Sequence, residues 1–225
     1  LVSVRGLGRR FGRHWALAHV DLDIEAGAVV LLAGPNGSGK TTLLRLLAGL
    51  YRPTTGTVRV AGEDPRRDAV SCRERLAMVS HHAFLYERLT ALETVRLWAG
   101  LSDRDATDEA LAELLDEVGL AGSRDQLVGG FSAGMRKRLT LLRTRLEQPA
   151  LVLWDEPFSS LDAAGRDLLR TWIAEFRRRG VTMLLATHDL DVAAELCDRA
   201  VVLRSGQKVW TGPPLDAGRR VEAMR

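Results

Sequence analysis

The stretch GPNGSGKT, residues 34–41, decides the fold of this 225-residue chain. It follows AVVLLA (28–33), a continuous apolar run with the length of a buried central strand in a parallel sheet. It leads into GKTTLLRLLAGL (39–50), whose apolar residues recur at helical spacing. The pattern G-x-x-x-x-G-K-S/T binds phosphate groups when it stands between a strand and a helix. The sequence therefore predicts a phosphate-binding loop in an α/β fold.

Each residue type in this loop suits a phosphate ligand. Gly34, Gly37 and Gly39 let backbone N–H groups approach the phosphates, and the start of the helix adds its positive dipole. Lys40 supplies a point charge for the β- and γ-phosphates, and the Thr41 hydroxyl suits Mg²⁺. The candidate nucleotide-binding residues of the stretch are Gly34, Pro35, Asn36, Gly37, Ser38, Gly39, Lys40, Thr41 and Thr42.

A second chemical signal is LVLWDEP, residues 151–157, an apolar run that ends in two carboxylates. Ligands bind at the carboxyl edge of a parallel sheet, so Asp155 and Glu156 are expected there. Asp155 suits Mg²⁺, and Glu156 suits the role of general base toward an attacking water. Acidic residues after a strand also cap helices, so Asp155 and Glu156 indicate a catalytic site only in combination with the phosphate loop.

The remaining apolar patterns extend the sheet. Alternation in VSVRGL (2–7) and WALAHVDLDIE (15–25) predicts half-buried strands near the N-terminus. TTGTVRVAGEDP (54–65) is typical of a short hairpin. VTMLLATHD (181–189) has the length of another buried strand, and AVVLRSGQKVWTG (200–212) predicts two short strands around Ser-Gly. Strands alternate with helical patterns, which indicates a parallel α/β sheet.

Residues 88–148 differ from the rest because helical periodicity runs through them without a strand signal. We expect a single domain over 1–225, in which 1–87 and 149–225 form the nucleotide-binding core and 88–148 form an inserted helical subdomain.

Composition excludes several classes of protein. The 29 acidic residues nearly balance the 32 basic ones, for a net charge of +3, so no nucleic-acid partner is expected. No apolar run approaches the roughly 20 residues that span a bilayer, so no direct membrane insertion is expected. Cys72 and Cys197 lack metal-ligand spacing and favour a reducing compartment.

With these motifs in place, the chain resembles the nucleotide-binding subunit of an ABC transporter over about residues 1–215. FSAGM (131–135) stands where that family has a signature Leu-Ser-Gly-Gly-Gln. The resemblance implies that Ser132 and Gly134 reach a nucleotide held by the other subunit of a dimer. Ala133 departs from the pattern and adds a methyl group where the backbone should approach phosphate. Taken alone, the segment is a helix N-cap at Ser132.

Three further residues take roles through the same resemblance. Asp162, in SSLD (159–162), matches the D-loop aspartate of the family, although it equally suits an N-cap. His188 follows a buried strand and matches the switch histidine that contacts the γ-phosphate. Phe11 matches the aromatic residue that stacks on adenine; a core-packing role and substitution by Trp15 are the alternatives.

The resemblance implies an α/β fold of the P-loop NTPase (RecA-like) type. It has a parallel-sheet core, an N-terminal antiparallel β subdomain and an inserted α-helical subdomain. It also implies an ATPase that uses ATP and Mg²⁺, with Lys40, Glu156 and His188 as catalytic residues and Thr41 and Asp155 at the metal. The expected partners are a second copy of the chain and a transmembrane permease subunit. The expected location is cytoplasmic, on the inner face of the cell membrane.

LTALETVRLWAGL (89–101) is similar to a segment of the haem-exporter subunit of cytochrome c maturation, which makes haem export one expectation. Exporters of drugs, lipids or polysaccharides are the alternative within transport. An ABC ATPase outside transport and a P-loop kinase of small molecules are more distant alternatives.

The pair His81–His82 stands at the Q-loop, where the family uses a glutamine that reaches Mg²⁺ and water. Counting from the following Leu-Thr favours His82 for this position, with His81 as the alternative. A histidine there would make hydrolysis sensitive to mild acid, because its reference pKa lies near 6.5.

Overall fold

The computed structural model describes residues 1–80, 85–102 and 106–223. In this part of the chain one sheet has the strand order β5-β6-β7-β3-β8-β9, parallel throughout except for β9. The strands are β3 (Val29–Ala33), β5 (Leu76–Val79), β6 (Leu151–Asp155), β7 (Thr182–Ala186), β8 (Arg199–Arg204) and β9 (Gln207–Gly212). The central strand β3 lies between β7 and β8 and is buried over its whole length, as the apolar run predicted.

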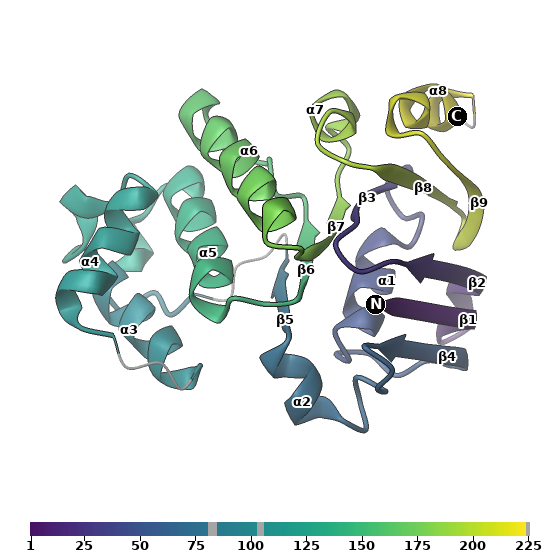
Figure 1. Ribbon diagram of the computed structural model, residues 1–225, viewed down its shortest axis with the longest axis horizontal. Coiled ribbons are helices and arrows are strands. Elements are labelled where there is room, and N and C mark those ends of the chain that lie inside the picture. Colours follow the sequence, from purple (N-terminus) through teal and green to yellow (C-terminus); the bar gives the residue numbers. More distant parts are fainter. Residues whose placement is uncertain (81–84, 103–105, 224–225) are drawn as a thin grey trace.

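A second, antiparallel sheet has the order β2-β1-β4, formed by β1 (Val2–Phe11), β2 (His14–Ile24) and β4 (Thr55–Val60). Figure 1 shows it beside α1, at the opposite end of the molecule from α3 and α4. The hairpin-like turn predicted over 54–65 is present only at its tip, where Val60 and Glu63 form an antiparallel bridge with hydrogen bonds in both directions. The strand β4 itself pairs with β1. Pairing with a distant strand is invisible to local turn signals.

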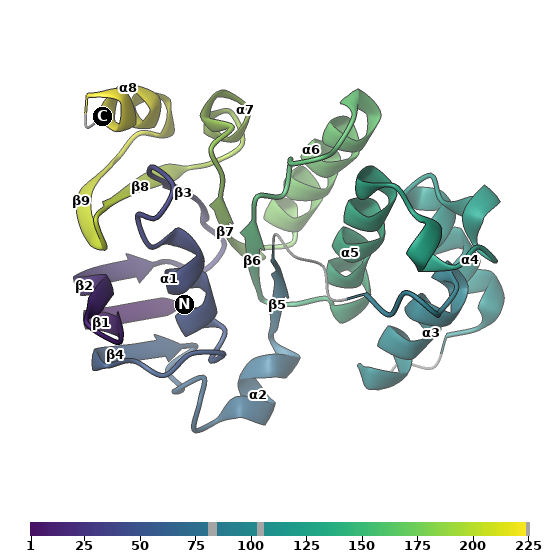
Figure 2. The same ribbon diagram turned by 180° about the vertical axis from the view of Figure 1, so that it is seen from behind.

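Helices lie on both faces of the parallel sheet: α1 lies on the side of the antiparallel sheet, and α3 to α8 contribute to the core on the other side (Figures 1 and 2). Within the described residues, the segment between β5 and β6 contains three α-helices and two short 3₁₀ turns, in agreement with the helical periodicity of 88–148. The α-helices of the chain are α1 (Lys40–Leu47), α2 (Ala69–Glu74), α3 (Ala91–Leu101), α4 (Asp108–Glu117), α5 (Ala133–Glu147), α6 (Ala163–Arg178), α7 (Leu190–Ala194) and α8 (Ala217–Glu222). The short helices α2, α7 and α8 carry too few turns for a periodic signal.

The two faces of the parallel sheet pack into different cores. In β3, Val30 and Leu32 face a cluster shared with α1 and the antiparallel sheet. Val29 and Leu31 face the other way, into a cluster shared with helices α3 to α8. Since successive strand residues point to opposite faces, one strand of five buried residues contributes to both cores.

Capping residues fix where the helices begin. At the start of α3 the Thr90 side chain accepts a bond from the Glu93 amide while the Glu93 carboxylate accepts one from the Thr90 amide. Ser132 caps α5 and Asp162 caps α6 through their side-chain oxygens. Each cap satisfies an N–H that the helix itself leaves free.

A buried hydrogen bond joins α5 to the parallel sheet. Trp154 of β6 is fully buried, and its Nε1 donates to Thr144 Oγ1 of α5 at 3.1 Å. Thr144→Val should lower the free energy of unfolding by about 1–3 kcal/mol, because the indole N–H loses its partner inside the core. Thr171→Val, at an exposed position of α6, is the matched control. It should change the free energy of unfolding by about 0.5 kcal/mol at most. Urea unfolding measures both; equal effects would contradict the assignment.

In the part of the chain that the structure describes, no helix combines the length and the apolar character needed to cross a membrane.

Candidate functional site

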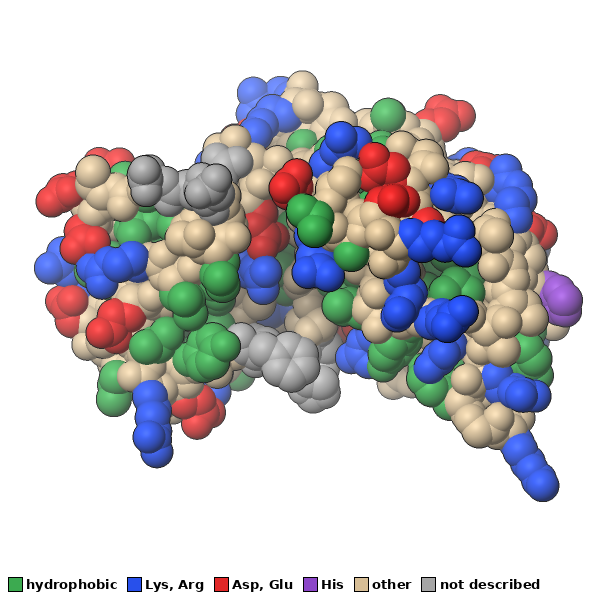
Figure 3. All heavy atoms as spheres, turned by 90° about the horizontal axis from the view of Figure 1, so that it is seen from below, with side chains coloured by type: hydrophobic (Ala, Val, Ile, Leu, Met, Phe, Trp, Pro, Cys, Tyr) green, Lys and Arg blue, Asp and Glu red, His purple; other side chains and the backbone are tan. Residues whose placement is uncertain are grey.

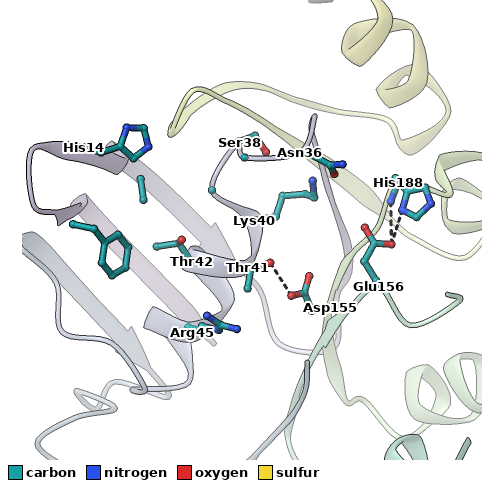
Figure 4. A pocket seen from close by; sticks show the side chains of 14 residues that line it. His14, Asn36, Ser38, Lys40, Thr41, Thr42, Arg45, Asp155, Glu156 and His188 are labelled. Atoms are coloured by element: carbon teal, nitrogen blue, oxygen red, sulfur yellow. Dashed lines mark hydrogen bonds and ion pairs between the residues drawn. The ribbon is translucent and has the colours of Figure 1, made fainter. Parts of the chain in front are cut away.

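A cavity of about 630 Å³ opens between the phosphate-loop stretch, the ends of β6 and β7, and the β1–β2 turn (Figure 4). Its volume lies within the range of small-molecule and cofactor sites. The predicted residues that line it are Phe11, Asn36, Gly37, Ser38, Gly39, Lys40, Thr41, Thr42, Asp155, Glu156 and His188. Gly34 and Pro35 complete the loop without lining the cavity.

The loop is shaped by glycine at positions where another residue would clash. Gly39 precedes α1 with φ 107°, and a Cβ there would lie 2.6 Å from both Ala16 O and Leu17 Cδ2 of β2. Gly34 has φ 144°, and its Cβ would lie 2.2 Å from Leu203 O of β8. The loop therefore follows a path that only glycine permits, and the free N–H groups of the first turn of α1 end at the cavity.

Lys40 is held across the loop. Its side chain is only 7% exposed, and Nζ donates to Gly34 O at 2.7 Å and to Pro35 O at 3.1 Å. Burial lowers the pKa of Lys40, while the charges of Glu156 and Asp155 act in the opposite direction. A buried cation that is bound to two carbonyl oxygens at the N-terminus of a helix is suited to bind an anionic ligand.

Thr41 and Asp155 come together although they are far apart in the sequence. Thr41 Oγ1 donates to Asp155 Oδ2 at 2.7 Å, and Asp155 is 3% exposed. A hydroxyl and a carboxylate side by side are oxygen ligands of the kind that Mg²⁺ takes next to a nucleotide. The neighbouring Ser38 Oγ is buried and has no hydrogen-bond partner among the described residues, which fits a phosphate oxygen at this place. The residues present therefore fit Mg²⁺ and a nucleotide phosphate.

Glu156 is turned toward the end of β7. Its backbone has φ 52°, in the left-handed region, and its N–H donates to Ala186 O at 2.7 Å. Its Oε2 accepts from Thr187 Oγ1 at 3.0 Å and lies 2.9 Å from Nδ1 of the exposed His188. Strained backbone of this kind at a cavity is typical of functional sites. Figure 4 shows Glu156 and His188 facing each other beside Asp155.

Phe11, not Trp15, is the aromatic residue at the cavity. Phe11 is 41% exposed at the end of β1, which excludes a pure core-packing role. Its ring meets Tyr51 edge-on at 5.5 Å between centroids, and the Arg9 guanidinium lies 4.5 Å from the Phe11 centroid. Tyr51 and Arg9 therefore set the position of the Phe11 ring, and part of the ring remains exposed for stacking on a base.

Two charged or polar residues at the cavity were missed by the sequence analysis. His14 begins β2, directly after the turn from Phe11, and Arg45 of α1 lies one turn beyond Thr41. Helical spacing of four residues from Thr41 was a signal that could have found Arg45. His14 was visible only as a neighbour of Phe11 in a hairpin.

Ser132, Gly134 and Asp162 do not join the cavity within this chain. Ser132 Oγ accepts from the Met135 amide at the start of α5. Asp162 accepts from the Gly165 amide, and its carboxylate also pairs with Arg138 of α5 at 2.5 Å and 2.6 Å. The Gly165 amide and then Arg138 lower the pKa of Asp162. Both helix caps foreseen as alternatives are therefore present.

The expected Q-loop residues, His82 or His81, lie outside the described residues.

Comparison with known proteins identifies relatives over almost the whole chain. The family model described as ABC transporter matches residues 17–159. The sulfate/thiosulfate import ATP-binding protein CysA 2 of Chromobacterium violaceum is 41% identical over 219 residues, covering 96% of this chain and 59% of that protein. CysA 1 of Rhizobium meliloti is 40% identical, covering 95% of this chain and 63% of that protein. The chain thus spans about 60% of the length of these relatives.

Solved structures agree in fold. An ATP-binding subunit of an ABC transporter has a TM-score of 0.89 at 30% identity, covering 100% of this chain and 94% of its own. The ATP-binding cassette MJ0796, a dimer bound to ADP and Pi, has a TM-score of 0.86 at 25% identity, with coverage of 95% and 99%. These neighbours confirm the predicted P-loop NTPase fold with its antiparallel β subdomain.

Proposed function

The chain belongs to the ABC transporter family, and we propose that it is the subunit that binds and hydrolyses ATP to drive transport. The observation that carries the proposal is one cavity in which a phosphate loop, a hydroxyl–carboxylate pair, a second carboxylate and a histidine face one another. Subunits of this family use ATP and Mg²⁺ and are ATPases.

The chemistry follows from the positions of the side chains. Lys40 and the N–H groups of the loop bind the β- and γ-phosphates, and Thr41 with Asp155 would hold Mg²⁺. Bound Mg²⁺ supplies positive charge that offsets the charge of the phosphate oxygens. Glu156 orients the attacking water and accepts its proton as the water oxygen bonds to the γ-phosphorus and the bond to ADP breaks. His188, beside Glu156, donates toward the γ-phosphate.

We assign Ser132, Gly134 and Asp162 to a nucleotide bound by a second copy of the chain. They lie outside the cavity of their own chain, at the starts of α5 and α6. MJ0796, which shares the fold, is described as a dimer with ADP and Pi. ATP would then hold two copies together, and loss of the γ-phosphate would release them. The predicted subdomain 88–148 would carry Ser132 and Gly134 of this surface, and Asp162 would belong to the nucleotide-binding core.

A membrane permease is the proposed second partner, which places the chain at the cytoplasmic face of the membrane. Exposed hydrophobic side chains support a docking surface. In Figure 3 one group of hydrophobic side chains lies on the half of the molecule that carries α3 and α4, and others lie on the opposite half. Leu101 and Leu127 are the exposed large hydrophobic residues of the segment 88–148 among those described.

The relatives favour import. Those reported above are sulfate/thiosulfate import subunits, so the haem-export expectation drawn from residues 89–101 has no support from them. We therefore propose an import system, with export of drugs, lipids or polysaccharides and a role outside transport as less supported alternatives.

Phosphate release tests the proposed activity. The purified chain with ATP should release inorganic phosphate only when Mg²⁺ is present, with a rate per chain that rises with protein concentration because a dimer hydrolyses ATP. Transfer of the phosphate to a small metabolite instead of water would favour the kinase alternative.

Phe11→Ala should weaken ATP binding. Base–aromatic stacking contributes about 1–3 kcal/mol, so the dissociation constant should rise roughly 5- to 150-fold. Phe11→Tyr should preserve the affinity, and Trp15→Ala should change it little because Trp15 does not line the cavity. Isothermal titration calorimetry measures all three. A larger effect at Trp15 than at Phe11 would contradict the assignment of the adenine site.

A further inference from the structure

Lys137 of α5 is an unusual lysine. Its side chain is 7% exposed, and its Nζ is buried without a hydrogen-bond partner among the described residues. Buried lysines ordinarily extend the ammonium group to solvent along a buried stem. Here the charged end itself is inside the protein, where an unpaired ammonium group is costly. An uncharged side chain of similar size at position 137 would avoid this loss of stability.

The position of Lys137 along α5 indicates which negatively charged groups are nearest to it. The bond from Trp154 to Thr144 fixes the level of α5 relative to β6. Lys137 lies two helical turns before Thr144, about 10 Å along the axis and on the same side of the helix. Because α5 runs opposite to β6, Lys137 is displaced from Thr144 toward the carboxyl end of β6, where Asp155 and Glu156 follow Trp154. Figure 1 shows α5 beside β5 and β6.

Electrostatics agree with this placement. Burial lowers the pKa of Lys137 to about 8, and the two opposing influences are the negative charges of Asp155 and Glu156. The same two carboxylates also act on Lys40. The carboxylate pair thus has one buried lysine in the phosphate loop and another in α5.

Other charges near α5 are engaged elsewhere. The strand β5, against which α5 packs, has only apolar side chains, Leu76 to Val79. On α3, Glu93 is bound to Thr90, and Arg96 is paired with Asp108. In the described part of the chain, Asp155 and Glu156 are therefore the charges that act on Lys137.

The choice of lysine is itself informative. The chain has three lysines among 32 basic residues, and two of the three, Lys40 and Lys137, are buried. Lysine is a compact point charge, whereas arginine needs room for a planar fork. A chain that uses arginine almost everywhere else keeps lysine at the two buried positions on which Asp155 and Glu156 act.

We propose that Lys137 is a positioning residue for hydrolysis: the charge of its buried ammonium group attracts the Asp155–Glu156 pair and helps to set where the two carboxylates lie. The charge makes the geometry of the carboxylates depend on where α5 stands. Since α5 begins at Ser132, the proposed contact point for the partner subunit, the same helix links that contact to the hydrolytic carboxylates. This inference rests on the proposed function.

Lys137→Met tests the charge because it keeps the length of the stem and removes the ammonium group. We expect kcat for phosphate release at pH 7.5 to fall at least about tenfold, since small displacements of catalytic groups are costly. The dissociation constant of a non-hydrolysable ATP analogue should change by about twofold at most, because Lys137 does not line the cavity. Lys208→Met, at an exposed position of β9, is the matched control and should leave both values unchanged.

Two readouts separate this role from a structural one. The folded chain binds the Lys137 proton less tightly than the unfolded chain, so the charge destabilises the fold below about pH 8. Lys137→Met should therefore unfold at the same or a higher temperature at pH 7, although its activity falls. In addition, kcat should fall while the dissociation constant of the ATP analogue stays within about twofold of the wild-type value, a separation that a loss of folded protein would not produce.

The outcomes distinguish this inference from the proposed function. A Lys137→Met variant that turns over ATP at the wild-type rate would overturn the role of Lys137 alone, and so would a lower unfolding temperature that accounts for the lost activity. Loss of analogue binding in Lys137→Met would also overturn it. A wild-type chain that binds no ATP analogue would overturn the proposed function itself.

Discussion

Glu156→Gln is expected to lower ATP turnover by about 10²-fold or more while ATP binding is retained, because general-base catalysis contributes about 10²–10⁴-fold. The amide keeps the shape of the side chain and can still accept from Thr187 and His188, which contact Oε2 in the wild-type chain. It cannot take the proton of the attacking water. Phosphate release at saturating ATP measures the loss.

The same variant should accumulate as a dimer in the presence of ATP and Mg²⁺. The γ-phosphate that joins the two copies is then not removed, so the contacts that it makes persist. Size-exclusion chromatography with and without ATP shows the change. Glu195→Gln, an exposed glutamate paired with Arg170, is the matched control and should hydrolyse ATP normally. Turnover by Glu156→Gln at the wild-type rate would show that another group is the base.

Lys40→Ala is expected to weaken ATP binding by about 10- to 100-fold, since a hydrogen bond to a charged group contributes about 1.5–3 kcal/mol. The variant removes the point charge at the phosphates and also the bridge between Gly34 O and Pro35 O that closes the loop. Titration calorimetry with ATP measures the affinity.

Thermal unfolding serves as the check on the Lys40 experiment. Burial lowers the pKa of Lys40, so the buried charge costs stability at neutral pH, and Lys40→Ala should not unfold at a much lower temperature. Lys208→Ala, at the exposed third lysine, should behave as wild type in both measurements. Unchanged ATP affinity in Lys40→Ala would refute the phosphate-loop assignment.

The two strongest motifs were predictable because each is contiguous. The strand, loop and helix around residues 34–41 contain their own signals: an apolar run, glycines at positive φ and a periodic helix. The run 151–157 likewise predicts a buried strand that ends in carboxylates. Periodicity and turn chemistry act over a few residues, so a local pattern is sufficient to predict such elements.

Pairings between distant segments were not predictable in the same way. The local pattern predicted the turn that follows β4, but it gave no sign that β4 pairs with β1, more than 40 residues away along the chain. His14 and Arg45 were overlooked because their approach to the cavity depends on how β2 and α1 pack. Such contacts depend on tertiary packing, and local propensity does not specify them.

By itself, the sequence determined the class of fold and the identity of the reactive groups, because Lys40, Thr41, Asp155 and Glu156 sit in motifs whose chemistry is local. Only the tertiary structure decided how these groups meet. The register of β6 and β7 pairs Asp155 with Ala186, which sets Glu156 beside Thr187 and His188. The bond from Trp154 to Thr144 docks α5 on β6, and this packing leaves Lys137 of α5 buried without a hydrogen-bond partner among the described residues. Strand register and helix packing are collective properties of the whole chain, and no single stretch encodes them.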